Sequence, residues 1–301
     1  MKTITFHIIS AISFLIILSG CRVDDSLFNA NEHPIDKYEL NNYKGEVDFN
    51  LDANYSIPQD LISLFTLNSK GAEESKATKI FAVYIGDINR ISTDTVIMYC
   101  HGNKDHMDFY WPRAQLLANT ISKNNYGVLM IDYRGYGLSE GEPSENALYN
   151  DVDAGLQWLK SKGLSDERLI IYGFSMGSAP ATKLCAEPRS MKPSKLILEA
   201  PFASAEAMVQ DAAVLSIPGV FVTDLKINNA DLIKNVQQPF MWIHGTKDHF
   251  LNINTQGEVI YNNYKGIYKE QHRIAGAGHS NVPLYFGFNN YLKAVGDFIR
   301  K

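Results

Sequence analysis

The sequence predicts an α/β fold built on a mostly parallel, doubly wound sheet. Short apolar runs recur from residue 95 onward, and each is followed by a turn and a segment of helical periodicity. Runs without polar alternation suit strands that are buried on both faces, as in a parallel sheet. Strands that alternate with helices indicate a sheet covered on both sides. The runs cover residues 95–100, 127–132, 168–172, 195–200 and 239–244.

Two segments have the periodicity of amphipathic helices. In the first, apolar residues recur at spacings of four, four and three residues behind Ser144, a residue type that caps helix N-termini. The second is the C-terminal segment, residues 291–300. We expect both helices to pack one face on the sheet. The apolar positions are Leu148, Val152, Leu156 and Leu159 in the first segment, and Leu292, Val295, Phe298 and Ile299 in the second.

The regular pattern is preceded by two shorter apolar runs, at residues 61–67 and 80–85, which we predict to be the first strands. Residues 21–60 are rich in Asn, Asp and Glu and lack clean periodicity, so we predict a tether there. This division leaves one folded domain over residues 61–301. Its length suits a single core.

The first twenty residues have the features of a signal peptide. Lys2 precedes an apolar stretch at residues 8–18. Eleven residues of helix span about 16 Å, roughly half of a ~30 Å hydrocarbon core, so the stretch is too short for a membrane anchor. The stretch ends in Leu-Ser-Gly-Cys, which resembles the lipobox of bacterial lipoprotein precursors.

That resemblance implies cleavage after residue 20, lipidation of Cys21, and anchoring to a membrane of the bacterial cell envelope. A plain secretory signal with a chance cysteine is the alternative. The other cysteines, Cys100 and Cys185, are too few for a disulfide framework, so we expect buried thiols. The formal net charge of −5 excludes the basic field that nucleic-acid binding requires.

The run that ends at residue 172 is followed by Gly-x-Ser-x-Gly, formed by Gly173, Ser175 and Gly177. Glycines on both sides of the serine remove the Cβ clashes of a sharp turn from a strand into a helix. Such a turn exposes the Ser175 hydroxyl and aims the N–H of Met176 at a developing oxyanion. Ser175 is therefore the candidate nucleophile, and a purely structural glycine turn is the alternative.

A serine nucleophile needs a histidine base and a carboxylate that orients the base. Among the eight histidines, His279 lies in the small-residue loop Gly-Ala-Gly-His-Ser, after a weak strand candidate at residues 271–275. Two carboxylates compete for the third role. Asp248 ends the turn His-Gly-Thr-Lys-Asp, and Glu199 lies within an apolar run. A charge inside an apolar strand is more easily explained as a hydrogen-bonded structural group, so we prefer Asp248.

An oxyanion hole needs a second backbone donor from the loop after the third strand. That loop reads His-Gly-Asn and places Asn103 at the donor position, opposite Met176. His101 and His244 each precede a glycine at a strand end. We interpret both as turn-stabilising histidines bonded to backbone rather than zinc ligands, because no set of cysteines or carboxylates lies beside them.

These motifs, together with Asp-Tyr-Arg-Gly-Tyr-Gly-Leu-Ser at residues 132–139, resemble the α/β-hydrolase superfamily. The resemblance is closest to the branch of acyl-protein depalmitoylases and lysophospholipid or monoacylglycerol lipases. It implies an α/β-hydrolase fold and hydrolysis of small-molecule or lipid acyl esters or thioesters through an acyl-enzyme, without a metal or organic cofactor. In that scheme Ser175 attacks, His279 transfers the proton, Asp248 holds the imidazolium, and the amides of Asn103 and Met176 bind the oxyanion.

Residues 203–236, between the last two regular runs, lie where a short helical cap is usual in such folds. Their apolar side chains could line an acyl pocket or pack a helix on the sheet, and the sequence leaves both open. The apolar residues are Met208, Val214, Leu215, Ile217, Pro218, Val220 and Phe221. Two other functions also remain open: a serine peptidase of the prolyl-oligopeptidase kind, and a non-catalytic, membrane-anchored binding lipoprotein.

Overall fold

The computed structural model describes residues 28, 30, 33–122, 126–213 and 223–301. Eight strands form one sheet in the order β1-β2-β4-β3-β5-β6-β7-β8. β1 pairs antiparallel with β2, β2 pairs antiparallel with β4, and the other neighbours are parallel. The predicted mostly parallel sheet is therefore confirmed. The strands are β1 (Ile62–Ser69), β2 (Thr78–Ile85), β3 (Val96–Cys100), β4 (Gly127–Ile131), β5 (Leu169–Phe174), β6 (Lys195–Glu199), β7 (Phe240–Gly245) and β8 (Lys269–Ile274).

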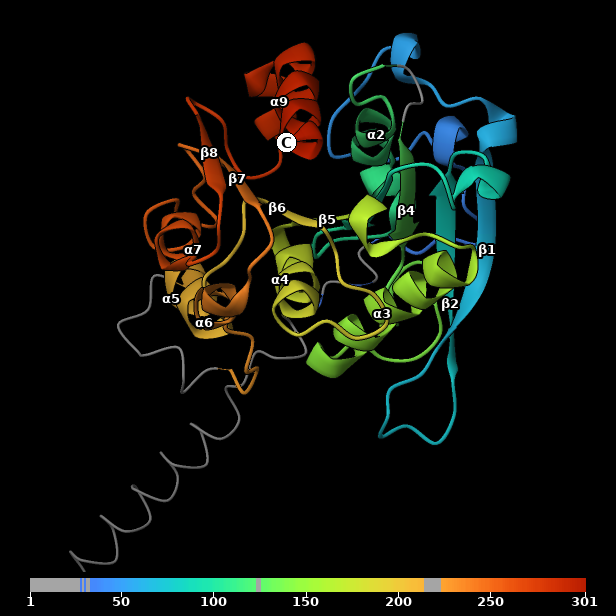
Figure 1. Cartoon of the computed structure of the whole chain (residues 1–301), viewed down its shortest axis with the longest axis horizontal. Helices are drawn as coiled ribbons and strands as arrows, with labels where there is room; N and C mark the ends of the chain where they lie inside the picture. Colours follow the sequence, from blue (N-terminus) through green and yellow to red (C-terminus); the bar gives the residue numbers. More distant parts are fainter. Residues whose placement is uncertain (1–27, 29, 31–32, 123–125, 214–222) are drawn as a thin grey trace, which may run out of the picture.

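Helices cover both faces of this sheet (Figure 1). α2 and α9 lie on one face, and α3 and α4 lie on the other. Ser144 caps α3 as predicted, since its hydroxyl accepts the N–H of Ala147 at 3.1 Å. The helices are α2 (Met107–Ala118), α3 (Glu145–Ser161), α4 (Ser178–Ala186), α5 (Ala205–Ala213), α6 (Asn229–Leu232), α7 (Gly257–Asn263), α8 (Val282–Phe286) and α9 (Phe288–Arg300).

The core lies on both faces of the central strands, which explains why their sequences do not alternate. In β3, Met98 and Cys100 belong to the cluster on one face, while Ile97 and Tyr99 belong to the cluster on the other. Cys100 and Cys185 are buried free thiols, as predicted. Burial raises the pKa of both thiols well above the ordinary cysteine value.

The N-terminal segment packs on the domain, which corrects the tether prediction for residues 33–60. The hydroxyl of Tyr38 donates to Asp132 at 2.6 Å, and the N–H of Leu40 donates to the buried Asp108 at 2.7 Å. Phe49 and Ile57 are only 6% and 2% exposed. The segment shows no periodicity because short 3₁₀ turns at η2 (Leu40–Asn42), η3 (Ala53–Tyr55) and η4 (Gln59–Leu61) build it.

Several predictions fall on residues that the structure does not describe. The signal peptide, residues 1–20, and Cys21 lie outside the described residues. So do residues 214–222, which hold six of the seven apolar positions of the cap. The seventh, Met208 on α5, packs partly buried against the core. Across the described parts of the chain, no helix is both long enough and apolar enough to cross a bilayer.

Candidate active site

Ser175 is the first residue of the 3₁₀ turn η7 (Ser175–Gly177), directly after β5, and its backbone is strained. Its φ of +52° is a left-handed conformation that non-glycine residues rarely adopt. A Cβ at Gly173 would lie 2.5 Å from the carbonyl oxygen of Gly177, and one at Gly177 would lie 2.0 Å from that of Cys100. Backbone cannot give way at these distances, so both flanking positions require glycine. The turn therefore has the geometry of a nucleophile elbow.

Hydrogen bonds join the three residues that the sequence predicts as a triad. Nε2 of His279 lies 2.8 Å from Oγ of Ser175, 104 residues away along the chain, and Nδ1 of His279 lies 2.7 Å from Oδ2 of Asp248. A carboxylate can only accept, so Nδ1 carries the proton and Nε2 accepts from the serine hydroxyl. This arrangement allows His279 to take the Ser175 proton as the oxygen attacks.

The turn after β7 holds Asp248 in one orientation. Oδ1 accepts the N–H groups of Phe250 at 3.0 Å and Leu251 at 2.7 Å. Oδ2 lies 2.7 Å from His279 and 3.1 Å from Nε2 of His244. Burial acts to raise the pKa of Asp248, but the hydrogen bonds from His244 and His279 outweigh it and hold the pKa well below its usual range. The carboxylate is therefore ionised at neutral pH.

A tyrosine brings the two predicted oxyanion residues together. The hydroxyl of Tyr136 donates to Oδ1 of Asn103, in the loop after β3, and lies 3.6 Å from Sδ of Met176, beside the nucleophile. One fully buried side chain thus contacts both loops. His101 stabilises the first loop as predicted, since its Nδ1 lies 2.8 Å from the carbonyl oxygen of Gly102.

Known proteins share this fold and parts of this sequence. A solved esterase from Pyrococcus furiosus superposes with a TM-score of 0.64 at 18% identity, covering 85% of this chain and 95% of that one. An acylaminoacyl peptidase from Pyrococcus horikoshii superposes with a TM-score of 0.55 at 18% identity, covering 79% and 40%. Residues 91–238 match the family model described as serine aminopeptidase, S33.

A relative extends the similarity beyond the fold. Alpha/beta hydrolase domain-containing protein 17B from Xenopus tropicalis is 32% identical over 204 residues, which are 67% of this chain and 65% of that protein. The chain has the α/β-hydrolase fold and is similar in sequence to α/β-hydrolases. The hydrolase spans slightly less than two thirds of this relative's length. Ser175 lies inside the matched family region, whereas Asp248 and His279 lie beyond its end at residue 238, so their placement depends on the structure.

Glu199, the competing carboxylate, belongs to a different cluster of the hydrolase. Nη1 of Arg113 donates to both of its carboxylate oxygens, at 2.7 and 2.9 Å, and the hydroxyls of Tyr172 and Tyr291 donate to Oε2. Arg113 also forms an ion pair with Asp48 of the N-terminal segment. The interpretation of Glu199 as a hydrogen-bonded structural group agrees with this geometry.

Sequence reasoning missed that this cluster reaches the candidate active site. Nη2 of Arg113 donates to the carbonyl oxygen of Ser280, directly after the base, at 3.1 Å. Its guanidinium lies 4.1 Å from the ring centroid of Phe174, directly before the nucleophile. The signal available in the sequence was a single arginine inside the largely apolar segment that forms α2. Nothing in the sequence around Asp48 indicated its role, because its partner, Arg113, lies 65 positions away along the chain.

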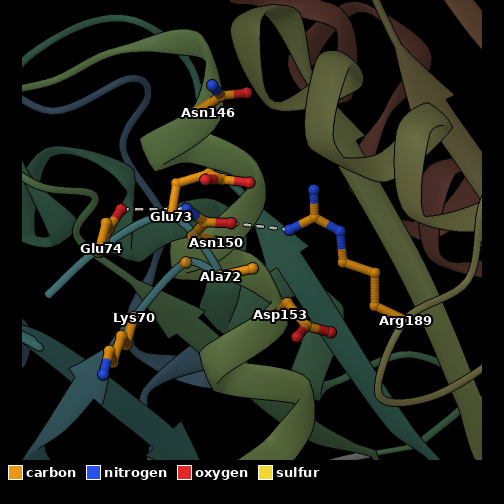
Figure 2. Close-up of a pocket in the computed structure, with 9 residues that line it drawn as sticks. Lys70, Ala72, Glu73, Glu74, Asn146, Asn150, Asp153 and Arg189 are labelled. Atoms are coloured by element: carbon orange, nitrogen blue, oxygen red, sulfur yellow. Dashed lines mark hydrogen bonds between the residues drawn. The ribbon is translucent and has the colours of Figure 1, made fainter.

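A polar pocket of about 570 Å³ lies apart from the triad, between the turn after β1, α3 and the loop after α4. Figure 2 shows Arg189 reaching toward Asn150, to which it donates at 2.8 Å, while Asn150 donates to Glu74 at 3.1 Å. These side chains form hydrogen bonds with one another across the pocket, and the bonds hold the turn after β1 against α3. In the described residues, no group of three or more His, Cys, Asp or Glu side chains is arranged to hold a metal ion.

Proposed function

We propose that this α/β-hydrolase is a serine hydrolase that cleaves carboxylic esters or thioesters through an acyl-enzyme. The observation that carries the proposal is the continuous hydrogen-bonded chain from Ser175 through His279 to Asp248, with links of 2.8 and 2.7 Å. These are the distances at which a general base activates a serine. The strained elbow at Ser175 and the depressed pKa of Asp248 support the same assignment.

In the proposed reaction, Oγ of Ser175 attacks the acyl carbon while Nε2 of His279 takes the hydroxyl proton. The backbone N–H groups of Asn103 and Met176 stabilise the oxyanion of the tetrahedral intermediate. His279 then returns its proton to the departing alcohol or thiol, which leaves the acyl group on Ser175. A water molecule, activated by the same histidine, attacks the acyl-enzyme and releases the acid. Asp248 stabilises the imidazolium in both halves and stays ionised.

The nature of the leaving group separates this proposal from a second one. The solved esterase from Pyrococcus furiosus favours esters. The family model and the acylaminoacyl peptidase favour cleavage of peptide amides by the same triad. Hydrolysis rates on p-nitrophenyl esters, acyl-thioesters and aminoacyl amides distinguish the two. An amide preference would replace the ester proposal with the prolyl-oligopeptidase-like one.

Labelling by a fluorophosphonate tests the catalytic assignment. Ser175 should displace fluoride and form a covalent serine phosphonate in the wild type, and Ser175→Ala should abolish the labelling. Ser178→Ala is a matched control, because Ser178 is a neighbouring buried serine whose hydroxyl contacts Asn229 instead of His279. Absence of labelling in the wild type would favour the binding-lipoprotein alternative.

We also propose that the hydrolase is a lipoprotein of the bacterial cell envelope, cleaved after residue 20 and lipidated on Cys21. The lipobox-like Leu-Ser-Gly-Cys sequence supports this proposal. A multiply acylated cysteine would bind a bilayer durably, at ~0.8 kcal/mol per buried CH₂. Wild-type protein should fractionate with membranes, and Cys21→Ala should be released. Membrane retention of Cys21→Ala would rule out lipid tethering.

A further inference from the structure

A buried tryptophan and histidine lie behind the acid of the triad. Nε1 of Trp242 lies 3.2 Å from Nδ1 of His244, and Nε2 of His244 lies 3.1 Å from Oδ2 of Asp248 and 3.0 Å from the carbonyl oxygen of Leu251. Trp242 and His244 are both fully buried, two residues apart on β7. The hydrogen-bonded chain of the triad thus continues two residues further into the sheet.

The donor and acceptor atoms of Trp242 and Asp248 determine which ring nitrogen of His244 carries the proton. An indole N–H can only donate, so Nδ1 of His244 must accept from Trp242. The neutral imidazole then carries its proton on Nε2, which faces the carboxylate of Asp248 and the carbonyl of Leu251, both acceptors. Oδ2 of Asp248 consequently receives N–H groups from two histidines. The sequence interpretation of His244 as bonded to backbone is correct for Leu251 but incomplete.

We propose that His244 is a positioning residue for the triad and that Trp242 sets its tautomer. With Nε2–H directed at Oδ2, His244 holds the carboxylate where it meets Nδ1 of His279. With Nδ1 occupied by the indole N–H, the proton of the neutral imidazole lies on Nε2, so His244 presents a donor to Asp248. The other tautomer would turn a lone pair toward the carboxylate and repel it from its place beside His279. This inference rests on the proposed triad function.

The surroundings of the pair keep this arrangement intact. A Cβ at Gly257, the first residue of α7, would lie 2.3 Å from Nδ1 of His244 and 2.4 Å from Nε1 of Trp242. Only glycine leaves room for the bond between them. The guanidinium of Arg273, from β8, lies 5.0 Å from the centroid of the Trp242 ring and is paired with Glu258 of α7 at 2.7 Å.

Trp242→Phe tests the inference, because it removes the indole N–H and keeps an aromatic ring. Trp111→Phe is the matched control: Trp111 is also buried and donates one hydrogen bond, to Asn41 at 2.9 Å, away from the triad. On a p-nitrophenyl ester, we expect kcat of Trp242→Phe to fall about tenfold at neutral pH with KM unchanged. The loss should fall on kcat, because the imidazole can then carry its proton on Nδ1 and turn a lone pair toward Oδ2 of Asp248. For Trp111→Phe, kcat and KM should both stay close to the wild-type values.

A loss of kcat in Trp111→Phe as large as that in Trp242→Phe would overturn the inference, and so would a loss confined to KM. Thermal unfolding establishes that each variant is folded. If Trp242→Phe does not fold, Gly257→Ala tests the same bond from the helix side and should show the same loss of kcat with KM unchanged. Failure of the wild type to react with a fluorophosphonate would instead refute the proposed function. The two failures are therefore distinguishable.

Discussion

Asp248 and Glu199 are two buried carboxylates at the carboxyl ends of neighbouring parallel strands, and their environments differ. Burial raises the pKa of Glu199, and Arg113 only opposes that rise. Burial also acts to raise the pKa of Asp248, yet its hydrogen bonds bring the pKa well below the usual range. Asp248 lies beside His279, which can gain and lose a proton, whereas Glu199 lies beside an arginine, which cannot. The partner, more than burial, distinguishes the proposed catalytic carboxylate from the structural one.

The local backbone contributes to this difference. Asp248 lies in a turn, where the N–H groups of Phe250 and Leu251 point at its side chain. Glu199 is the last residue of β6 and pairs with strands on both sides. The backbone N–H groups near Glu199 form hydrogen bonds within the sheet, so other side chains must donate to its carboxylate oxygens. Three predictions test the contrast between the two carboxylates.

The largest expected effect is on turnover. Asp248→Asn should lower kcat by about 10⁴-fold, the loss typical when a triad histidine is held in the wrong tautomer. Glu199→Gln should lower kcat by less than about tenfold, since Glu199 has no contact with the base. Ester hydrolysis at saturating substrate measures both. A loss for folded Glu199→Gln as large as that for Asp248→Asn would contradict the assignment of Asp248 as the acid.

For the free energy of unfolding, we expect Glu199→Gln to have a larger effect than Asp248→Asn. Glu199→Gln leaves Arg113 buried with one of its two carboxylates missing, and we expect the free energy of unfolding to fall by about 3–5 kcal/mol. Asp248→Asn should cost about 1–3 kcal/mol, because two backbone donors keep an acceptor. Urea unfolding of both variants provides the comparison. If Glu199→Gln is the more stable of the two variants, the pairing of Arg113 with Glu199 does not stabilise the fold as its geometry indicates.

The smallest effect concerns how stability changes with pH. Asp248 has a lowered pKa in the folded state, so its contribution is complete above its unfolded value of about 3.9 and is lost as the pH falls below it. Glu199 has a raised pKa in the folded state, so its contribution is larger in acid and is lost as the pH rises through about 4.3 toward the folded value. Urea unfolding between pH 3 and 6 should therefore show opposite trends. As the pH falls, the difference in free energy of unfolding between wild type and Asp248→Asn should become smaller. The difference between wild type and Glu199→Gln should become larger.

Features that depend on local backbone sterics were predictable from the sequence alone. The sheet strands follow from unbroken apolar runs, and the elbow follows from glycines on either side of Ser175, because a side chain there would collide with the backbone. The base loop was also predictable, since small residues around His279 leave room for an imidazole. These constraints act over a few residues and therefore leave a local pattern in the sequence.

Only the tertiary structure determined which carboxylate meets the base, and that His244 supports it. It also showed that the N-terminal segment supplies Asp48 to Arg113, which in turn reaches Ser280 from 167 positions away. Ion pairs and hydrogen bonds between distant elements have no periodicity and no required spacing, so no window of sequence contains them. They form only when the sheet brings the strand ends to one edge, where Asp248 meets His279 and Glu199 meets Arg113.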